Sequence, residues 1–442
     1  MTWPCKKKLL ILEIRVVLAP TSNIRRPKCK VRIPHYPHFI NCLLRSNDYF
    51  WQLTAGMGVD KYAKKLNSLQ LVEIIAFAQM EQLNGLRDIS NSFNDPQFSR
   101  AINLESISFS QIARRLRDLP PEFIRLLFSY LTTRVGQEIG FANLRNMVGR
   151  IYLIDSTTIS LCLSQYRWAE FRRTKGGVKL HLRLKFCEEE VLPDKAIVTP
   201  ARPADKTQMD ALVVEEKEAL NVFDRGYVDY KKFDRYCEEG IRFASRLKGN
   251  ALVTVVKDLP LNPDSKVKQD RIVYLGKDGV TKMKHPLRLI TTEDTKGQPV
   301  VIVTNDFELK AEELSEIYRK RWQIELFFKW TKQHLRVKHF YGKSEQAVEN
   351  QLFIALITYC LMVMLQLRAG YQGPLLTIKR LIRTCLYEPF TFFVQNLHLK
   401  PKRRSRGRRR IDHEDFYREI VKQVLAGEAD YLNDVTYDPL VL

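Results

Sequence analysis

One segment near position 320 places a single carboxylate among positive charges. The run YRKRWQIELFFKWTK holds five lysines or arginines and one acidic residue, Glu325. An α-helix advances about 100° per residue, which brings four side chains within about 60° of one another: Tyr318, Arg321, Glu325 and Lys332. Taken alone, this face is open to two interpretations. It is either a functional surface or a solvated helix on which Arg321 and Glu325 form an ion pair worth a few tenths of a kcal/mol.

Two aspartates are further candidates for the same site as Glu325. Each follows an apolar segment that has the pattern of a buried strand. Asp155 ends the strand predicted in RIYLIDSTTIS, and Asp224 ends the strand predicted in NVFDRGY. Ligands gather at strand ends in α/β sheets, so the three carboxylates converge if the strands are neighbours and the helix packs over them. Three close anions repel one another strongly, and a divalent cation is the usual remedy. All-oxygen ligands select a hard ion such as Mg²⁺ or Mn²⁺.

The region from about 150 to 308 has the pattern of a mixed α/β fold. Three meandering strands are predicted in RIYLIDSTTIS, VKLHLRLKF and DKAIVTPA. A helix from about 206 to 220, a strand in NVFDRGY, a helix in KKFDRYCEEG and a strand in IRFASRL follow. Four further strands, ALVTVV, RIVYL, PLRLIT and VVIVTN, form a β-rich block at about 248–308. This block stands between Asp224 and the helix of Glu325.

Helices are predicted on both sides of this region. From about 40 to 148 short helices follow one another, and one of them carries Arg114, Arg115 and Arg117. Such helices suit a domain that reads DNA, with solvation of a surface face as an equal alternative for the arginines. A second apolar helix is predicted over 345–367. Its apolar stretch of 14 residues is shorter than the roughly 20 needed to cross a bilayer, so we expect a buried helix.

Composition narrows the class of partner. The chain has 72 Lys and Arg against 50 Asp and Glu, a formal net charge of +22. This excess favours a polyanionic partner, with nucleic acid ahead of an anionic membrane surface.

The eight cysteines contain no C-x-x-C pair, which disfavours a zinc site or a dense disulfide framework and favours a reducing compartment. Residues 1–39 are predicted to be a basic, non-secretory arm, and Lys400–Arg410, with eight basic residues in eleven, a solvated tail.

The motifs resemble those of a known enzyme family. LIDSTTI, VFDRGY and the spaced set Tyr318-x2-Arg321-x3-Glu325-x6-Lys332 look like those of the DDE transposases of bacterial insertion sequences, in the YREK-signature group (insertion sequence family four). The resemblance covers about residues 40–370. It implies a helical DNA-end-binding domain at 40–148 and a ribonuclease H-like catalytic core at 149–370, into which the β-rich block is inserted. The arm at 1–39 is not part of it, and a helical and basic C-terminal region is predicted at 371–442.

The resemblance also implies roles for individual residues. Asp155, Asp224 and Glu325 would bind two Mg²⁺ ions, with Mn²⁺ able to substitute, for an in-line phosphodiester displacement. Tyr318, Arg321 and Lys332 would contact the DNA backbone near the scissile bond. DNA binding is further predicted for Arg225, Arg114, Arg115 and Arg117, with a structural ion pair as an equal alternative for Arg225.

Four other residues are not included in the predicted site. His181 has no second His or Cys at ligand spacing. Asp205 precedes a predicted helix, which favours an N-cap over a fourth metal ligand. Trp322 and Trp330 could stack on an unpaired base, but core packing is the simpler expectation for both.

The implied function is DNA transposition by cleavage and joining. A cytoplasmic, nucleoid-associated transposase would bind terminal inverted repeats of double-stranded DNA, cut there and join the freed 3′-ends to target DNA. The resemblance, and no feature of the sequence, implies a homodimer on paired ends. We expect no membrane association. Two other functions stay open: a catalytically inactive DNA-binding regulator, disfavoured by the intact carboxylates, and a ribonuclease H-like nuclease that cuts without joining.

Overall fold

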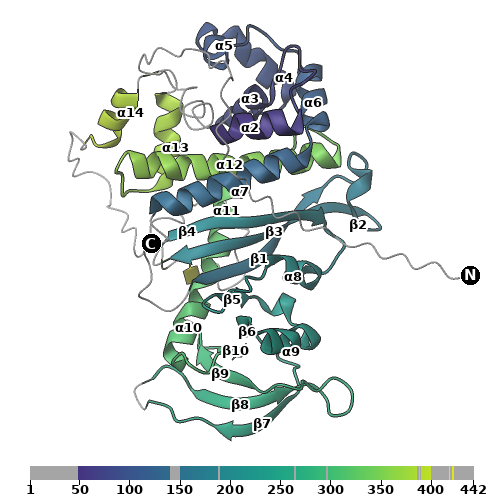
Figure 1. Cartoon of the computed structure of the whole chain (residues 1–442), viewed down its shortest axis with the longest axis vertical. Helices are drawn as coiled ribbons and strands as arrows, with labels where there is room; N and C mark the ends of the chain where they lie inside the picture. The colour runs from purple at the N-terminus through teal and green to yellow at the C-terminus, as the bar shows by residue number, and fades with distance from the viewer. Residues whose placement is uncertain are drawn as a thin grey trace, which may run out of the picture. The chain divides into compact units, whose positions relative to one another are not determined.

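The computed structural model describes residues 48–139, 150–187, 190–262, 265–294, 297–385, 388, 390–399, 418, 421 and 422 (Figure 1). By its internal contacts the chain divides into Met1–Ile33 and Pro34–Leu442, and every described residue belongs to the second unit. The predicted basic arm and the basic run Lys400–Arg410 therefore lie outside the described residues.

Six helices precede the sheet in the described part of the chain, and their ends follow from local capping. Asn67 and Gln70 form a reciprocal capping box at the start of α3, and Ser108 and Gln111 form another at the start of α6. Each box satisfies backbone N–H groups that have no partner within the helix. The helices are α2 (Asp48–Met57), α3 (Ser68–Glu81), α4 (Leu86–Asn91), α5 (Pro96–Ile102), α6 (Phe109–Asp118) and α7 (Pro121–Ile139).

The first half of the sheet is mixed, as the sequence predicts. Strands β4, β3 and β1 are antiparallel neighbours, whereas β1, β5 and β6 run parallel to one another. The short strand β2 lies on β3 as a hairpin. The helix predicted over 206–220 is only two short turns, at Asp205–Gln208 and in α8 (Met209–Leu212). The strands are β1 (Ile151–Leu161), β2 (Glu170–Arg172), β3 (Lys175–Cys187), β4 (Glu190–Pro200), β5 (Leu220–Phe223) and β6 (Arg242–Arg246).

The β-rich block extends this same sheet instead of forming one of its own. Its last strand pairs antiparallel with β6, so the order continues β6-β10-β9-β8-β7. The reason is burial: the middle of β6 is covered, and its backbone groups need a partner strand on both sides. The four strands are β7 (Val253–Asp258), β8 (Gln269–Leu275), β9 (Leu287–Glu293) and β10 (Pro299–Thr304).

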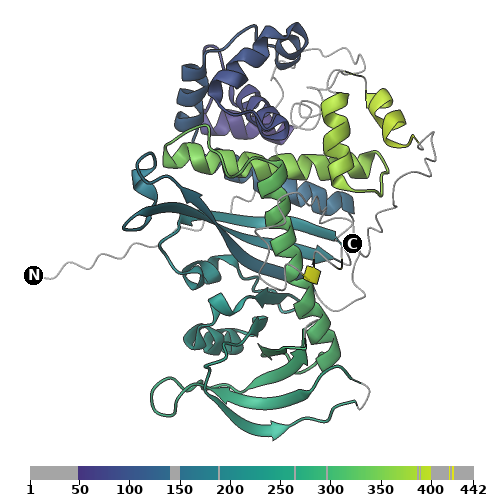
Figure 2. The ribbon, with the colours of Figure 1, turned by 180° about the vertical axis from the view of Figure 1, so that it is seen from behind.

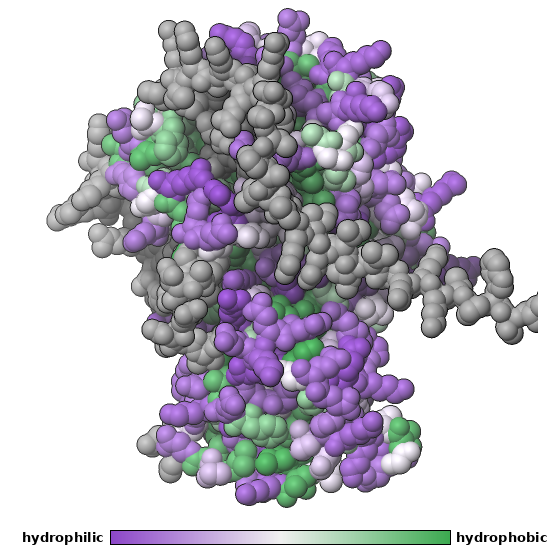
Figure 3. Space-filling model, viewed as in Figure 1, coloured by the Kyte–Doolittle hydropathy of each residue, from purple (hydrophilic) through white to green (hydrophobic). Residues whose placement is uncertain are grey.

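Strand β7 forms the free edge of the sheet, and its apolar side chains are exposed. Figure 3 shows apolar side chains gathered where β7 and β8 lie. The pairing register shifts between Val255 and Lys257, so the edge carries a β-bulge. A bulge interrupts the row of backbone groups that another strand would need for pairing, which protects an exposed edge against aggregation. The exposed apolar residues are Leu252, Val253, Val255 and Val256.

Helix α12 connects the sheet to the N-terminal helices. It is apolar around its whole circumference and buried along most of its length, and it packs on α3, α6 and α7 as well as on β4. The sequence predicts a helical DNA-end-binding domain at 40–148, and the described helices of that region share one apolar core with α12 and the sheet. Figure 2 shows α10 and α11 crossing one face of the sheet. The remaining helices are α9 (Tyr230–Glu239), α10 (Ala311–Lys320), α11 (Trp322–His334), α12 (Glu345–Arg368), α13 (Leu375–Thr384) and α14 (Phe390–Leu397).

Among the described residues, α12 is the one helix whose length and apolar composition would allow it to cross a membrane, and its apolar stretch is completely buried. This confirms the buried helix expected from the sequence.

A buried ion pair ties β8 to β9. Arg288 donates two hydrogen bonds to Asp270, at 2.9 and 2.6 Å, and both side chains are less than one-tenth exposed. Arg288 also donates to the carbonyl of Leu309, just before α10. The pair therefore links the extension of the sheet to the helix that leads towards Glu325.

We predict that Asp270→Ala lowers the free energy of unfolding by about 3 kcal/mol, because it leaves the guanidinium buried without a counter-ion. Urea unfolding followed by circular dichroism measures the loss. Asp258→Ala is the matched control, since it breaks an exposed pair with Arg271 and costs below about 1 kcal/mol. The double variant Asp270→Leu, Arg288→Met should regain most of the loss, and an equal loss in Asp270→Ala and Asp258→Ala would contradict the prediction.

Candidate active site

Two aspartates meet at one edge and on one face of the sheet. The parallel pairing of β1 with β5 ends at Ile154 and Phe223, so Asp155 and Asp224 are the next residues of two adjacent strands. Ile154 and Phe223 both pack into the core on one face. Because side chains alternate along a strand, Asp155 and Asp224 project towards the other face. The adjacency expected from the sequence is confirmed, but β1 does not end at Asp155. It continues to Leu161, paired with β3.

Helix α11 packs on β1 and brings Glu325 to this face. Arg321 lies at the break between α10 and α11, where the single predicted helix is divided. Its guanidinium donates to the Asp155 carboxylate at 3.2 Å and to the Glu325 carboxylate at 2.9 Å. The Arg321 side chain is 7% exposed. One buried arginine thus bridges two of the three predicted carboxylates.

The carboxylates are electrostatically coupled. Burial raises the pKa of Asp155 to about 7, with further contributions from Glu325 and Asp224, while Arg321 and the backbone N–H of Ser156 oppose the rise. Burial likewise raises the pKa of Glu325, and Arg321 again opposes it. Both shifts express the cost of placing several negative charges in a poorly solvated site. A positive charge nearby is therefore needed to stabilise the ionised forms of Asp155 and Glu325.

The donor chemistry suits a hard divalent ion, because every candidate ligand is a carboxylate oxygen. In the part of the chain that the structure describes, however, no three acidic, histidine or cysteine side chains stand close enough together to hold one ion. Arg321 supplies the positive charge between Asp155 and Glu325 instead. A metal ion would therefore compete with Arg321 for the same oxygens.

The other predicted residues around the site differ in accessibility. Lys332 extends from α11 to β1, where its amino group donates to the hydroxyl of Thr157 at 2.6 Å. Tyr318 is 7% exposed and contacts the guanidinium of Arg321 with its ring. Arg225, next to Asp224, is exposed and forms no ion pair with any described residue. The structural ion pair considered for Arg225 is thus absent from the described part of the chain.

The three arginines of α6 have three different environments. Arg115 lies beside the buried face of the helix, where it pairs with Asp60 and donates to the carbonyl of Val59. Arg115 thus has a structural role, and its DNA contact stays a prediction. Arg117 pairs with Asp118 at 2.8 Å on the surface, and Arg114 is exposed.

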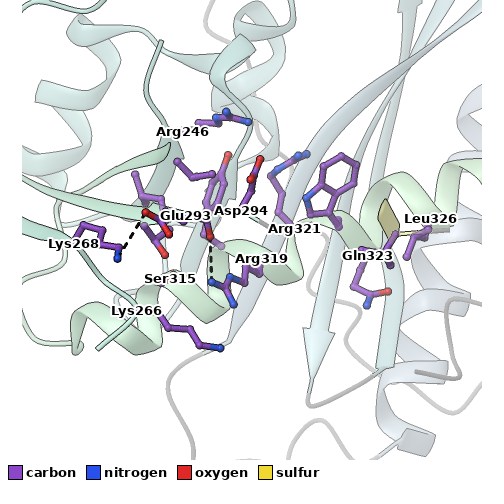
Figure 4. A pocket seen from close by; sticks show the side chains of 16 residues that line it. Arg246, Lys266, Lys268, Glu293, Asp294, Ser315, Arg319, Arg321, Gln323 and Leu326 are labelled. Carbon is purple, nitrogen blue, oxygen red and sulfur yellow. Dashed lines mark hydrogen bonds and ion pairs between the residues drawn. The ribbon is translucent and has the colours of Figure 1, made fainter. Parts of the chain in front are cut away.

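A cavity of about 620 Å³ adjoins the carboxylates, and Tyr318, Arg321 and Trp322 contribute to its wall. Figure 4 shows the labelled side chains of the lining, which come from β6, the sheet extension, α10 and α11. Of its basic lining, the sequence predicted only Arg321 as a site residue. Arg319 lies in the same segment, but the other basic residues were missed because they are far apart along the chain. The basic residues that line it are Arg246, Lys266, Lys268, Arg319 and Arg321.

The two tryptophans for which we expect core packing also differ. Trp330 is fully buried and packs against Tyr359, which confirms core packing. Trp322 is partly buried and stands under the guanidinium of Arg321 at the cavity wall.

Comparison with known proteins identifies the family. Residues 146–361 match the transposase DDE domain, a range that includes all three carboxylates. The chain is 26% identical over 324 residues to a probable transposase for insertion sequence element IS5377 of Geobacillus stearothermophilus, covering 72% of this chain and 82% of that protein. It is 32% identical over 243 residues to the putative transposase y4zB of Sinorhizobium fredii, covering 53% and 66%.

Among solved structures, the piggyBac transposase in a synaptic complex with hairpin DNA aligns with a TM-score of 0.39 and 10% identity over 88% of this chain and 85% of that chain. The family assignment rests on the domain match and on the two sequence relatives. The chain belongs to the DDE transposases.

Proposed function

We propose that this transposase binds the terminal inverted repeats of an insertion sequence, cleaves the DNA at the element's ends and joins the freed 3′-ends to target DNA. The observation that carries the proposal is the position of Asp155 and Asp224 at the ends of two adjacent parallel strands, with Glu325 joined to Asp155 through Arg321. An in-line phosphodiester displacement needs this kind of carboxylate set, because acidic residues hold the divalent ions that such reactions use.

A ribonuclease H-like core is part of the proposal. The strand order β4-β3-β1-β5-β6, antiparallel in its first half and parallel in its second, supports it. Assignment to the YREK-signature group rests on Tyr318, Arg321, Glu325 and Lys332. Tyr318 and Arg321 line the cavity beside the carboxylates, Glu325 binds Arg321, and Lys332 reaches the strand of Asp155.

Asp155, Asp224 and Glu325 would hold Mg²⁺, for which Mn²⁺ would substitute. The bound ions would neutralise charge on the scissile phosphate and lower the pKa of the attacking water or hydroxyl. The protein's own contribution is to hold the carboxylates together. Arg321 offsets their repulsion in the metal-free chain, and the hydrogen bond from the Ser156 amide to Asp155 fixes one carboxylate oxygen.

The surface around the carboxylates would bind the DNA backbone. The net charge of +22, the basic cavity and the exposed Arg225 and Arg114 support a polyanionic ligand on this protein. Lys332 would contact phosphate close to the scissile bond. A homodimer would hold two ends together, and the reaction would take place on chromosomal DNA in the cytoplasm.

Replacing Asp224 tests the site directly. We predict that Asp224→Asn lowers the cleavage rate by at least about 1000-fold, because a neutral amide is a poor ligand for a hard cation, while end binding changes less than about threefold. The assay incubates the full chain with a labelled duplex of the repeat that flanks its gene, with Mg²⁺ or with EDTA, on a denaturing gel.

Asp229→Asn is the matched control for Asp224→Asn, because Asp229 caps α9 five residues later and pairs with Lys206 on the surface. It should cleave like the wild type. A cleaving Asp224→Asn variant would remove Asp224 from the site. Joined products, in addition to nicks, distinguish a transposase from a nuclease that only cuts.

Lys332→Ala tests the proposed phosphate contact. It should weaken end binding and reduce the slope of log affinity against log salt by about one, because one fewer phosphate is neutralised. Affinity is measured by fluorescence anisotropy between about 50 and 200 mM salt. Lys217→Ala is the control, since Lys217 precedes β5 and lies at the opposite end of that strand from Asp224. Equal slopes for both variants and the wild type would exclude the contact.

Arg321→Met tests the competition between this arginine and a metal ion. The variant should unfold at a lower temperature in EDTA, because Asp155 and Glu325 lose their shared counter-charge. Mn²⁺ should then raise its unfolding temperature by more than it raises that of the wild type, since the ion no longer displaces an arginine. Arg319→Met, which changes the cavity wall without touching either carboxylate, should behave like the wild type. Equal Mn²⁺ effects in all three proteins would contradict the competition.

A further inference from the structure

A second polar cluster lies behind the catalytic face, on the opposite side of β1. Ser156 follows Asp155, and its side chain therefore projects to the other face of the sheet. The Ser156 hydroxyl donates to the carboxylate of Asp205 at 2.7 Å, while its backbone N–H donates to Asp155 at 2.7 Å. One residue thus joins the two carboxylates through the thickness of the strand.

Asp205 is held in place from a second side. The amino group of Lys179, on β3, lies 3.0 Å from the Asp205 carboxylate and donates at 3.0 Å to the carbonyl of Pro203. Asp205 begins a short 3₁₀ turn whose N-cap is Ala204. The sequence favoured Asp205 as an N-cap, but its side chain is used in this cluster instead. The Lys179 side chain is 12% exposed, so the ion pair is largely shielded from water.

Lys179 is the cation that balances Asp205. His181 is fully buried beside it, with Nδ1 3.9 Å from the Asp205 carboxylate and Nε2 3.0 Å from the Thr199 hydroxyl. Burial lowers the pKa of His181 to about 4, so its ring is neutral near pH 7. His181 fills the space behind Asp205 without adding charge.

The same cluster touches the strand of Asp224. The turn that follows Asp224 packs against Asp205, since a Cβ at Gly226 would lie 3.8 Å from the Asp205 carboxylate. The turn is closed by a hydrogen bond from the Tyr227 amide to the Asp224 carbonyl at 3.0 Å. Tyr227 is buried, and its pKa is raised well above 10 by burial and by the charges of Asp155 and Asp205. Asp205 therefore contacts both the residue that follows Asp155 and the turn that follows Asp224.

We propose that Asp205 is a positioning residue, which holds Ser156 and the turn after Asp224 so that both aspartates keep the orientation needed to bind metal. This inference rests on the proposed function of Asp155 and Asp224. Asp205 is not itself a ligand, because it lies on the opposite face of β1 and reaches Asp155 through Ser156. Partners of this kind orient the ligands of a metal site.

The test measures Mn²⁺ affinity of the full chain from the rise of its thermal unfolding midpoint with Mn²⁺ concentration. Asp205→Ala should weaken Mn²⁺ binding by about 10- to 100-fold. Asp205→Asn keeps an oxygen that accepts from Ser156 and should lose less than about threefold. Ser156→Ala removes only the connecting hydroxyl and should lose part of what Asp205→Ala loses, because Asp205 still contacts the turn after Asp224. The double variant should bind no more weakly than Asp205→Ala.

Asp210→Ala is the matched control. Asp210 lies on the neighbouring α8 and accepts a hydrogen bond from Tyr236 at 2.6 Å, so its loss should lower the unfolding temperature without changing Mn²⁺ affinity. If Asp205→Ala and Ser156→Ala behave like Asp210→Ala, the positioning role is overturned. Asp155→Asn distinguishes failure of the proposed metal site from failure of the proposed role of Asp205. If it too leaves Mn²⁺ affinity unchanged, the proposed metal site has failed, and the inference with it; if it alone abolishes binding, only the role of Asp205 is excluded.

Discussion

Mutual repulsion of partly buried carboxylates is the constraint on which this structure depends. Asp155 and Glu325 both have pKa values raised by burial, with Asp224 adding to the cost. In the metal-free chain a single buried guanidinium, that of Arg321, offsets this repulsion. Its position at the break between α10 and α11 lets it reach both a strand and a helix. The proposed metal ions would take over this neutralising role from Arg321.

The rest of the fold keeps the carboxylates in reach of Arg321. Parallel pairing of β1 with β5 brings the two aspartates to one edge of the sheet, because parallel strands end on the same side. Helix α11 is fixed on that face by its apolar residues, and the buried α12 extends the same core to the N-terminal helices. On the other face, Ser156, Asp205 and Lys179 form a polar layer behind the aspartates. The proposed catalytic residues are therefore supported from both faces of the sheet.

The sheet extension contributes to the same region of the molecule. Because β10 pairs with β6, the extension is rigidly continuous with the strands that carry the aspartates. It also contributes Lys266 and Lys268 to the wall of the cavity, beside Arg246 at the end of β6. The buried pair of Asp270 and Arg288 connects it to the start of α10. A β-rich insertion placed between Asp224 and Glu325 in the chain thus both extends the sheet and forms part of the cavity wall with charged residues of both signs.

The sequence by itself determined the local features: the apolar strands, the aspartates that follow their buried parts, the spacing of Tyr318, Arg321, Glu325 and Lys332, and the buried helix α12. These are properties of residue type and period, and neighbouring residues are enough to specify them. Only the tertiary structure decided which charges pair. Arg115 binds Asp60, Arg321 binds Asp155, and Asp205 binds Ser156 and Lys179. Such pairs form between residues far apart in the chain, and their energy depends on burial and distance in the folded state, neither of which a local pattern contains.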